Sequence, residues 1–295
     1  MSIVRSTYHS RLSALSSQTR RIGDRMARAQ LEASSGLKVM RASDAPGRTS
    51  YIHSVRESRA DQSEYTSNAD WAFQHLSTAD GALGGLATVI SEARELAVQM
   101  SSETYNAATR VNSQDDATAL FDRAIMFANT NLGGRYLFAG EAYDSEAYDA
   151  ATGAYLGDTE EPEVAVADGN VSVLTGFDGS NLLQGTGDVI TALQNLETAL
   201  GTGNAADVQA TIDDLDAAME QIAVARTVLG GEMQRADDGR AIAQTMTIAL
   251  AEQESDLVDA DAVESFTNLF EVQQAFEAAL QVTANARSSL LFSRL

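Results

Sequence analysis

Side chains that bind metals or transfer protons are few and scattered in this sequence of 295 residues. It contains no cysteine, which excludes disulfides, thiolate metal sites and a cysteine nucleophile. The three histidines, His9, His53 and His75, belong to no metal-binding motif such as HExxH. On one straight helix, His53 and His75 would lie about 33 Å apart, too far to share a metal ion. We interpret all three as solvated or interfacial side chains.

Other patterns that could bind a nucleotide or a cation each have a simpler structural explanation. Residues 81–85, Gly-Ala-Leu-Gly-Gly, lack the preceding strand that a nucleotide-binding loop requires. The aspartate clusters at 213–216 and 256–261 do not match an EF-hand loop, and are typical of a solvated helix face or a helix start. The sequence has no nucleophile elbow and no P-loop. We therefore predict a protein that is not an enzyme, with no catalytic residue, metal site or cofactor.

Charge is distributed unevenly along the chain. The 42 acidic and 20 basic side chains give a net charge of -22, yet residues 1–60 carry +7 and the other 235 carry -29. Because excess negative charge repels phosphate, we expect no binding to nucleic acid. No apolar run approaches the ~20 residues of a membrane span, so we expect no membrane partner. The basic segment could bind nucleic acid or a membrane; we favour an acidic protein surface, on this chain or a neighbouring one.

Apolar residues at alternating spacings of four and three predict long helices that pack as coiled coils. Only Pro46 and Pro162 interrupt the backbone, which leaves room for such helices. One seam runs from residue 51 to 100, and another from 208 to about 250. The N-terminal seam consists of Tyr8, Leu12, Leu15, Thr19, Ile22, Met26, Ala29 and Ala33. The C-terminal seam consists of Phe266, Leu269, Gln273, Phe276, Leu280, Thr283, Arg287 and Leu290.

Signals for chain reversal divide these helices into segments. Gly36 is typical of a helix end, and residues 43–46, Ser-Asp-Ala-Pro, predict the start of the long second helix. A third helix is expected at about 113–132. Residues 133–187 are rich in glycine and aspartate, with short alternating stretches that predict a small β-rich insert. We expect five segments: 1–42, 43–135, 136–187, 188–258 and 259–295.

The predicted fold class is mainly α with a small β-rich insert. The long N- and C-terminal helices would pack as a coiled-coil bundle, with the insert at their far end. Each terminal helix has a narrow apolar stripe with few large residues, so it would be marginal without partners. Such ends predict polymerisation, and we expect ten residues to form the assembly interface: Tyr8, Leu12, Leu15, Ile22, Met26, Phe266, Leu269, Phe276, Leu280 and Leu290.

Several stretches near both ends of the chain are similar to the motifs of a known family. Residues 31–39, which include Ser35 and Gly36, and residues 42–47, which include Asp44, resemble the N-terminal signature of bacterial flagellins and their junction relatives. Residues 94–99, 256–261 and 289–292 are similar to its later helices. The stretch 133–140 resembles the members that join hook to filament rather than the flagellins themselves, and its characteristic residues are Arg135, Tyr136, Leu137, Phe138 and Gly140.

The resemblance implies a structural subunit of the flagellin-like fold, located outside the cell in the bacterial flagellum. It implies export by the flagellar type III apparatus without a cleaved signal peptide. The subunits would form a homo-oligomeric ring above the first hook-associated protein and below flagellin. A cytosolic export chaperone would bind the C-terminal helix. Two alternatives remain: a short flagellin that forms the filament itself, and a helical enzyme or signalling rod, for which the sequence offers no site residues.

Overall fold

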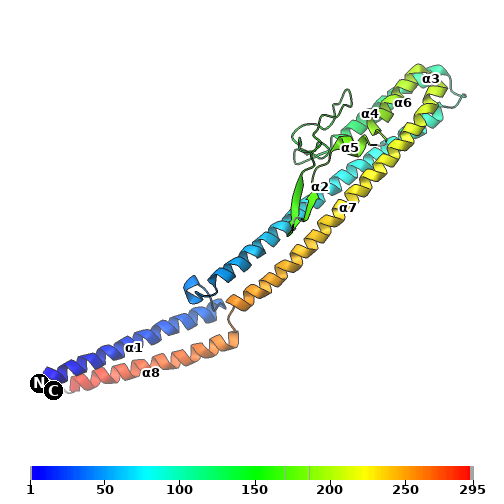
Figure 1. Cartoon of the computed structure of the whole chain (residues 1–295). Helices are drawn as coiled ribbons and strands as arrows, with labels where there is room; N and C mark the ends of the chain where they lie inside the picture. The colour runs from blue at the N-terminus through cyan, green and yellow to red at the C-terminus, as the bar shows by residue number, and fades with distance from the viewer. Residues whose placement is uncertain (1, 170, 186, 293–295) are drawn as a thin grey trace. The chain divides into compact units, whose positions relative to one another are not determined.

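A computed structural model describes residues 2–169, 171–185 and 187–292 (Figure 1). The chain is mostly helical with a few short strands, which confirms the predicted fold class. It divides into two compact units. We call residues 1–59 with 248–295 the terminal unit, and residues 60–247 the central unit. The sequence-based division into five segments stays a prediction.

The terminal unit is built on two antiparallel helices, α1 (Ser2–Ser35) and α8 (Ala262–Phe292), which lie side by side (Figure 1). It also contains the short 3-10 helix η1 (Ala42–Asp44), the first residues of α2 (Thr49–Met100) and the last residues of α7 (Ala205–Val258). The segments that follow α1 and α7 pair with each other. The N–H of Lys38 donates to the carbonyl of Val258 at 2.8 Å, and that of Ala260 donates to the carbonyl of Gly36 at 2.8 Å.

Helix α1 ends where the glycine signal predicted. Gly36 adopts a φ of +71°, a conformation that residues with a Cβ rarely adopt, and its N–H donates to the carbonyl of Glu32. The predicted start of the second helix was three residues early. Asp44 instead accepts hydrogen bonds from the N–H groups of Met40 and Arg41, so its carboxylate stabilises the preceding turn. Helix α2 begins only at Thr49.

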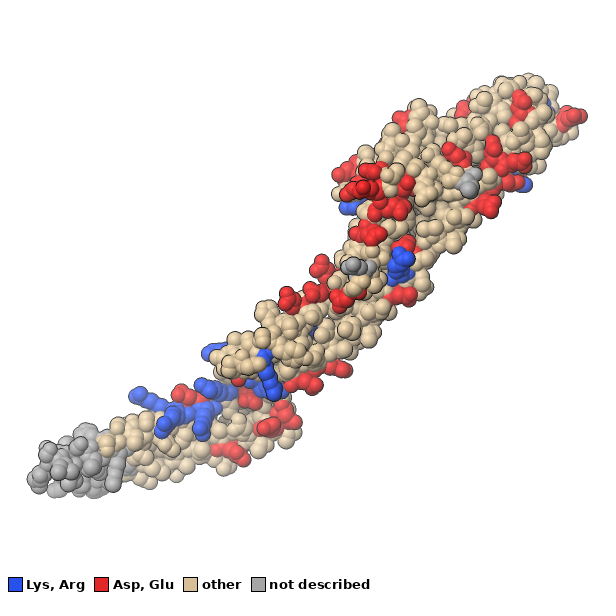
Figure 2. All heavy atoms as spheres, in the orientation of Figure 1, with Lys and Arg blue, Asp and Glu red and all other residues tan. Residues whose placement is uncertain are grey.

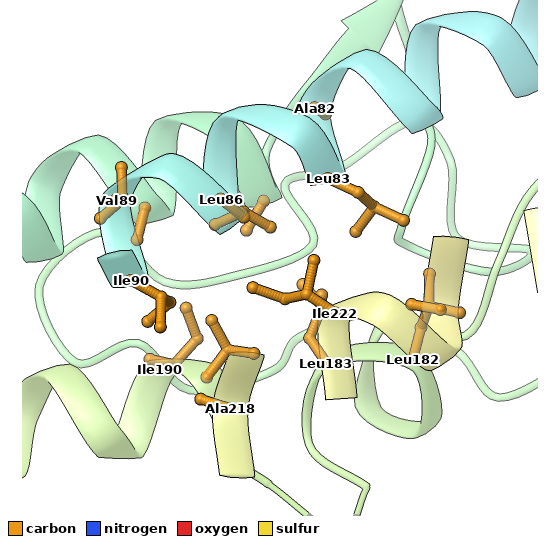
Figure 3. Packing of buried hydrophobic residues seen from close by; sticks show 14 of the residues in the cluster. Ala82, Leu83, Leu86, Val89, Ile90, Leu182, Leu183, Ile190, Ala218 and Ile222 are labelled. Carbon is orange, nitrogen blue, oxygen red and sulfur yellow. The ribbon is translucent and has the colours of Figure 1, made fainter. Parts of the chain in front are cut away.

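The central unit surrounds one apolar core formed by α2, α7, three shorter helices and residues of the insert (Figure 3). The three helices are α4 (Gln114–Ala128), α5 (Gly179–Leu183) and α6 (Val189–Thr202), and a fourth short helix, α3 (Ala107–Asn112), follows the end of α2. Leu86 and Ile90 of α2 point toward Ile222 of α7 and Ile190 of α6 (Figure 3). Burial of these side chains is the main source of stability for the unit.

Helix α4 confirms the expected third helix, but it ends at Ala128, four residues before the predicted end at 132. Its buried face includes Ala117, Leu120, Phe121, Ala124 and Ala128. The same packing explains one of the glycines inside α2. A Cβ on Gly85 would lie 2.5 Å from the ring of Phe127, so only glycine lets α4 approach this closely. The glycine therefore weakens the helix locally but allows a helix–helix contact.

Arginine–aspartate pairs join α2 and α7 across the central unit. Arg226 donates two hydrogen bonds to Asp80, at 2.8 and 3.1 Å, and Arg240 donates to Asp70 at 3.2 Å. Arg94 pairs with Asp216, and this hydrogen bond lowers the pKa of the Asp216 carboxyl. These side chains are largely exposed, so screening by water keeps the contribution of each pair to stability small. Together they favour one antiparallel register of the two helices.

The insert contains two small antiparallel hairpins. Strands β1 (Asn131–Leu132) and β2 (Arg135–Tyr136) form the first, and β3 (Glu163–Ala167) and β4 (Val171–Leu174) form the second. Gly169, between β3 and β4, has a φ of +82°. Strands β2, β3 and β4 lie within residues 133–187, where alternating stretches predicted strands, whereas β1 precedes that range.

The second hairpin lies along the helices, not at the end of the helical bundle as we expected. Asn68 of α2 donates to the carbonyl of Ala165 at 3.0 Å, and a Cβ on Gly239 of α7 would touch Val166 at 2.6 Å. The end of α2 is instead joined to other helices. There the buried Arg110 of α3 donates to the carbonyls of Met100 and Gly203. The position of the hairpin depends on contacts with residues distant in sequence, so no local sequence pattern could predict it.

Candidate assembly surface

The seam between α1 and α8 is narrow and mostly made of small residues. The hydroxyls of Thr19 and Thr283 form a hydrogen bond across it, with their oxygens 3.1 Å apart, and the hydroxyl of Ser265 donates to the carboxylate of Glu32 at 3.2 Å. Between these contacts, a Cβ on Gly23 would lie 3.4 Å from the ring of Phe276. Large apolar side chains are few, so burial within the seam stabilises the pair only modestly.

The predicted assembly residues fall into three groups. Five are half-buried side chains: Leu15, Ile22, Met26, Leu269 and Phe276. Phe266 and Leu280 are 50% and 46% exposed. The side chains of Tyr8, Leu12 and Leu290 lie outside the described residues. The role of all ten in assembly stays a prediction.

Phe266 and Leu280 lie outside the seam. At each of them the predicted seam position is one residue later than the position that the structure buries or half-buries. The α8 positions that the structure buries or half-buries include Ser265, Leu269, Phe276, Ala279 and Thr283. Ser265, a buried polar residue paired with Glu32, takes the position we assigned to Phe266. The prediction relied on hydrophobicity alone, which favoured Phe266 over Ser265, and it was wrong at this position.

A second apolar stripe on α8 is exposed, and sequence reasoning missed it. Val263, Phe266 and Phe270 are 78%, 50% and 64% exposed, and their spacing places them on one side of the helix. The same spacing of three and four that predicted the inner seam could have identified this stripe. Large apolar side chains gathered on an exposed face are typical of a protein–protein contact.

The outer faces of the two terminal helices carry opposite charge. Arg20, Arg21 and Arg28 are exposed on α1, whereas Glu271 and Glu277 are exposed on α8. Figure 2 shows the basic side chains along α1 and the acidic ones along α8. A helix pair with one basic and one acidic face is complementary to a second copy of itself, which favours side-by-side packing of copies.

The stretch 135–140 holds the insert in place. Leu137 and Phe138 are buried in the core of the central unit, and the carbonyl of Phe138 accepts the N–H of Gly179 at 3.1 Å. Gly140 has a φ of +62°, and a Cβ there would lie 2.2 Å from the carbonyl oxygen of Asp158. These residues therefore serve the fold of the insert.

Arg135 and Tyr136 lie at the surface end of the same stretch. The guanidinium of Arg135 lies 3.6 Å from the ring centre of Tyr143 and 5.7 Å from that of Trp71, a cation–π arrangement. The N–H of Tyr136 donates to the carbonyl of Tyr143 at 2.8 Å. Elsewhere in the insert, burial raises the pKa of the Tyr155 hydroxyl to about 12. That hydroxyl donates to the carbonyl of Asp158 at 2.7 Å.

The aspartates that could have formed cation sites have structural roles. Asp261 accepts the N–H groups of Val263 and Glu264 at the start of α8, and Asp214 accepts a hydrogen bond from Asn195. Across the described ranges, no group of three or more acidic or histidine side chains could hold a metal ion. Nor does any described helix combine the length and apolar character needed to cross a bilayer.

Both ends of the chain match models of a known protein family. Residues 6–142 match the bacterial flagellin N-terminal helical region, and residues 212–292 match the bacterial flagellin C-terminal helical region. The two matches include all of α4 and α8 and most of α1, the elements that carry most of the motifs discussed above.

Individual relatives cover different shares of the chain. Flagellar hook-associated protein 3 of Escherichia coli is 24% identical over an alignment of 284 positions, which covers 88% of this chain and 89% of that protein. A flagellin of Clostridium tyrobutyricum is 32% identical over 97 residues, 33% of this chain and 26% of its own length. The crystal structure of hook-associated protein 3 from Legionella pneumophila has a TM-score of 0.62 at 13% identity, over 70% of this chain and 98% of that one. The chain belongs to the bacterial flagellin family and is a structural protein of the flagellum, not an enzyme.

Proposed function

We propose that this protein forms the junction between the flagellar hook and the flagellin filament, as a ring of identical subunits. The observation that carries the proposal is the likeness to hook-associated protein 3 over 88% of the chain. The likeness to a flagellin covers only 33% of it. The exposed apolar stripe and the opposite charges of α1 and α8 support assembly of copies through the terminal unit.

In this proposal the ring contacts the first hook-associated protein on one side and flagellin on the other. The protein reaches this extracellular location through the flagellar type III apparatus, without cleavage of a signal peptide. Before export, a cytosolic chaperone binds α8. The exposed side chains of Val263, Phe266 and Phe270 support this part, because a cytosolic partner would keep them from water until assembly.

The alternative function is that of a short flagellin, and the observation in its favour is the 32% identity over 97 residues. The two functions differ in self-assembly. A flagellin adds to filament seeds without limit, whereas a junction subunit stops at a ring.

We expect the purified protein to form no long filaments on filament seeds under conditions in which flagellin elongates them. Electron microscopy after incubation with seeds measures the outcome. Deletion of the gene is expected to leave hooks without filaments and to release flagellin into the medium. Long filaments of this protein alone would support the flagellin alternative and contradict the junction.

A further inference from the structure

A hollow of about 720 Å³ opens in the terminal unit, between the segment after α1 and the first turns of α2. Leu37, Val39, Met40 and Ile52 form its apolar wall. Ile52 is buried, whereas Met40 is 41% exposed. An apolar hollow of this size open to water is unfavourable for the isolated chain, and is typical of a surface that another helix or loop fills.

The polar residues around the hollow are mainly basic. Its polar lining consists of Arg41, Thr49, His53, Arg56 and Glu57. Over the whole stretch 36–59, five basic side chains stand against two acidic ones, a net charge of +3. Arg56 also pairs with Glu254 at 2.6 Å, which fixes its position at the rim. The hollow is therefore suited to an apolar segment that carries negative charge.

The start of α8 has the complementary character. Residues 261–271 include Asp261, Glu264 and Glu271 and no basic side chain, a net charge of -3. The same turns present the exposed stripe of Val263, Phe266 and Phe270, at positions i, i+3 and i+7. This is the pattern by which an amphipathic helix binds an apolar groove. In its own chain the stripe is at least half exposed, so it does not fill the hollow of the same copy.

We propose that the hollow of one copy receives the Val263–Phe266–Phe270 stripe of a second copy. Such a contact joins two different surfaces of the same protein, and successive contacts of this kind close into a ring or continue as a helix. The acidic side chains of residues 261–271, around the stripe, then face Arg41 and the basic residues near it. This inference rests on the proposed function, since it names the contact by which the subunits of the ring join.

Disulfide cross-linking tests the contact, because the natural sequence contains no cysteine that could interfere. His53→Cys lies in the hollow and Thr267→Cys lies beside the stripe, and both sites are exposed. After oxidation of flagella that carry the double variant, we expect dimers and larger multimers of this protein on a non-reducing gel. The matched control pairs His53→Cys with Val282→Cys, which is 54% exposed farther along α8, and should give monomer only.

A charge exchange provides a second measurement that does not depend on cysteines. Arg41→Glu and Glu264→Arg are each expected to lower incorporation into flagella several-fold, and the two together to restore it. Equal cross-linking in both cysteine pairs, a cross-link to a different protein, or a double charge variant as poor as the single ones would overturn the contact. The presence of the unmodified protein at the junction is scored separately, so failure of the contact is distinguishable from failure of the proposed function.

Discussion

Phe276→Asp is expected to abolish incorporation into the flagellum while the central unit stays folded. Phe276 is one of few large side chains in the seam between α1 and α8, and its ring lies near Gly23. Placing a carboxylate there removes apolar burial and leaves a charge against α1, at a cost on the order of 3 kcal/mol. Because the seam is otherwise made of small residues, the α1–α8 pair has little stability to lose. Immunoblots of isolated hooks, with any filaments that they carry, measure the incorporation.

The matched control is Gln274→Asp, which adds the same charge two residues earlier at an exposed position of α8. It should incorporate far better than Phe276→Asp. Trp71, the only tryptophan, lies in the central unit next to His75 and Arg135, so its fluorescence reports whether that unit is folded. Normal incorporation of Phe276→Asp would show that the seam is not required for assembly.

Leu137→Ala is expected to destabilise the central unit by about 2–5 kcal/mol, the usual cost of emptying a buried leucine site. Leu137 is 2% exposed and belongs to the stretch that holds the insert against the helices. Its N–H donates to the carbonyl of Thr130 at 3.1 Å, and its carbonyl accepts the N–H of Phe177 at 2.9 Å. A cavity there therefore loosens the segments on both sides. Urea denaturation followed by Trp71 fluorescence measures the free energy of unfolding.

Leu156→Ala makes the same chemical change within the insert at a residue that is 56% exposed. It should cost less than about 0.5 kcal/mol, as surface substitutions usually do. Equal losses of stability in the two variants would mean that the stretch around Leu137 does not anchor the insert.

Periodicity predicted the helices of this protein well because their packing repeats along the sequence. The N-terminal seam from Leu15 to Met26 faces inward as the spacing indicated, and Gly36 ends α1 because only glycine adopts that conformation easily. Helix α4 was likewise expected from the sequence, although it ends at Ala128 and not at residue 132. In each case one local pattern was sufficient.

Features that depend on contacts distant in sequence could not be predicted in this way. Ser265 takes the seam position expected for Phe266 because Glu32, far away in the sequence, accepts its hydrogen bond. The β3–β4 hairpin lies beside Asn68 and Gly239 for similar reasons. The hollow beside Ile52 arises from a turn whose course depends on Asp44. The surface that we propose for assembly therefore became visible only in the structure.

The junction proposal is tested most directly by locating the protein on the flagellum. Antibodies against residues 141–168, an acidic stretch of the insert, would be applied with gold label to intact flagella and imaged by electron microscopy. We predict label in one narrow band between hook and filament, and none on the hooks of a deletion strain. Label along the whole filament, or no label on flagella that contain the protein by immunoblot, would contradict the account.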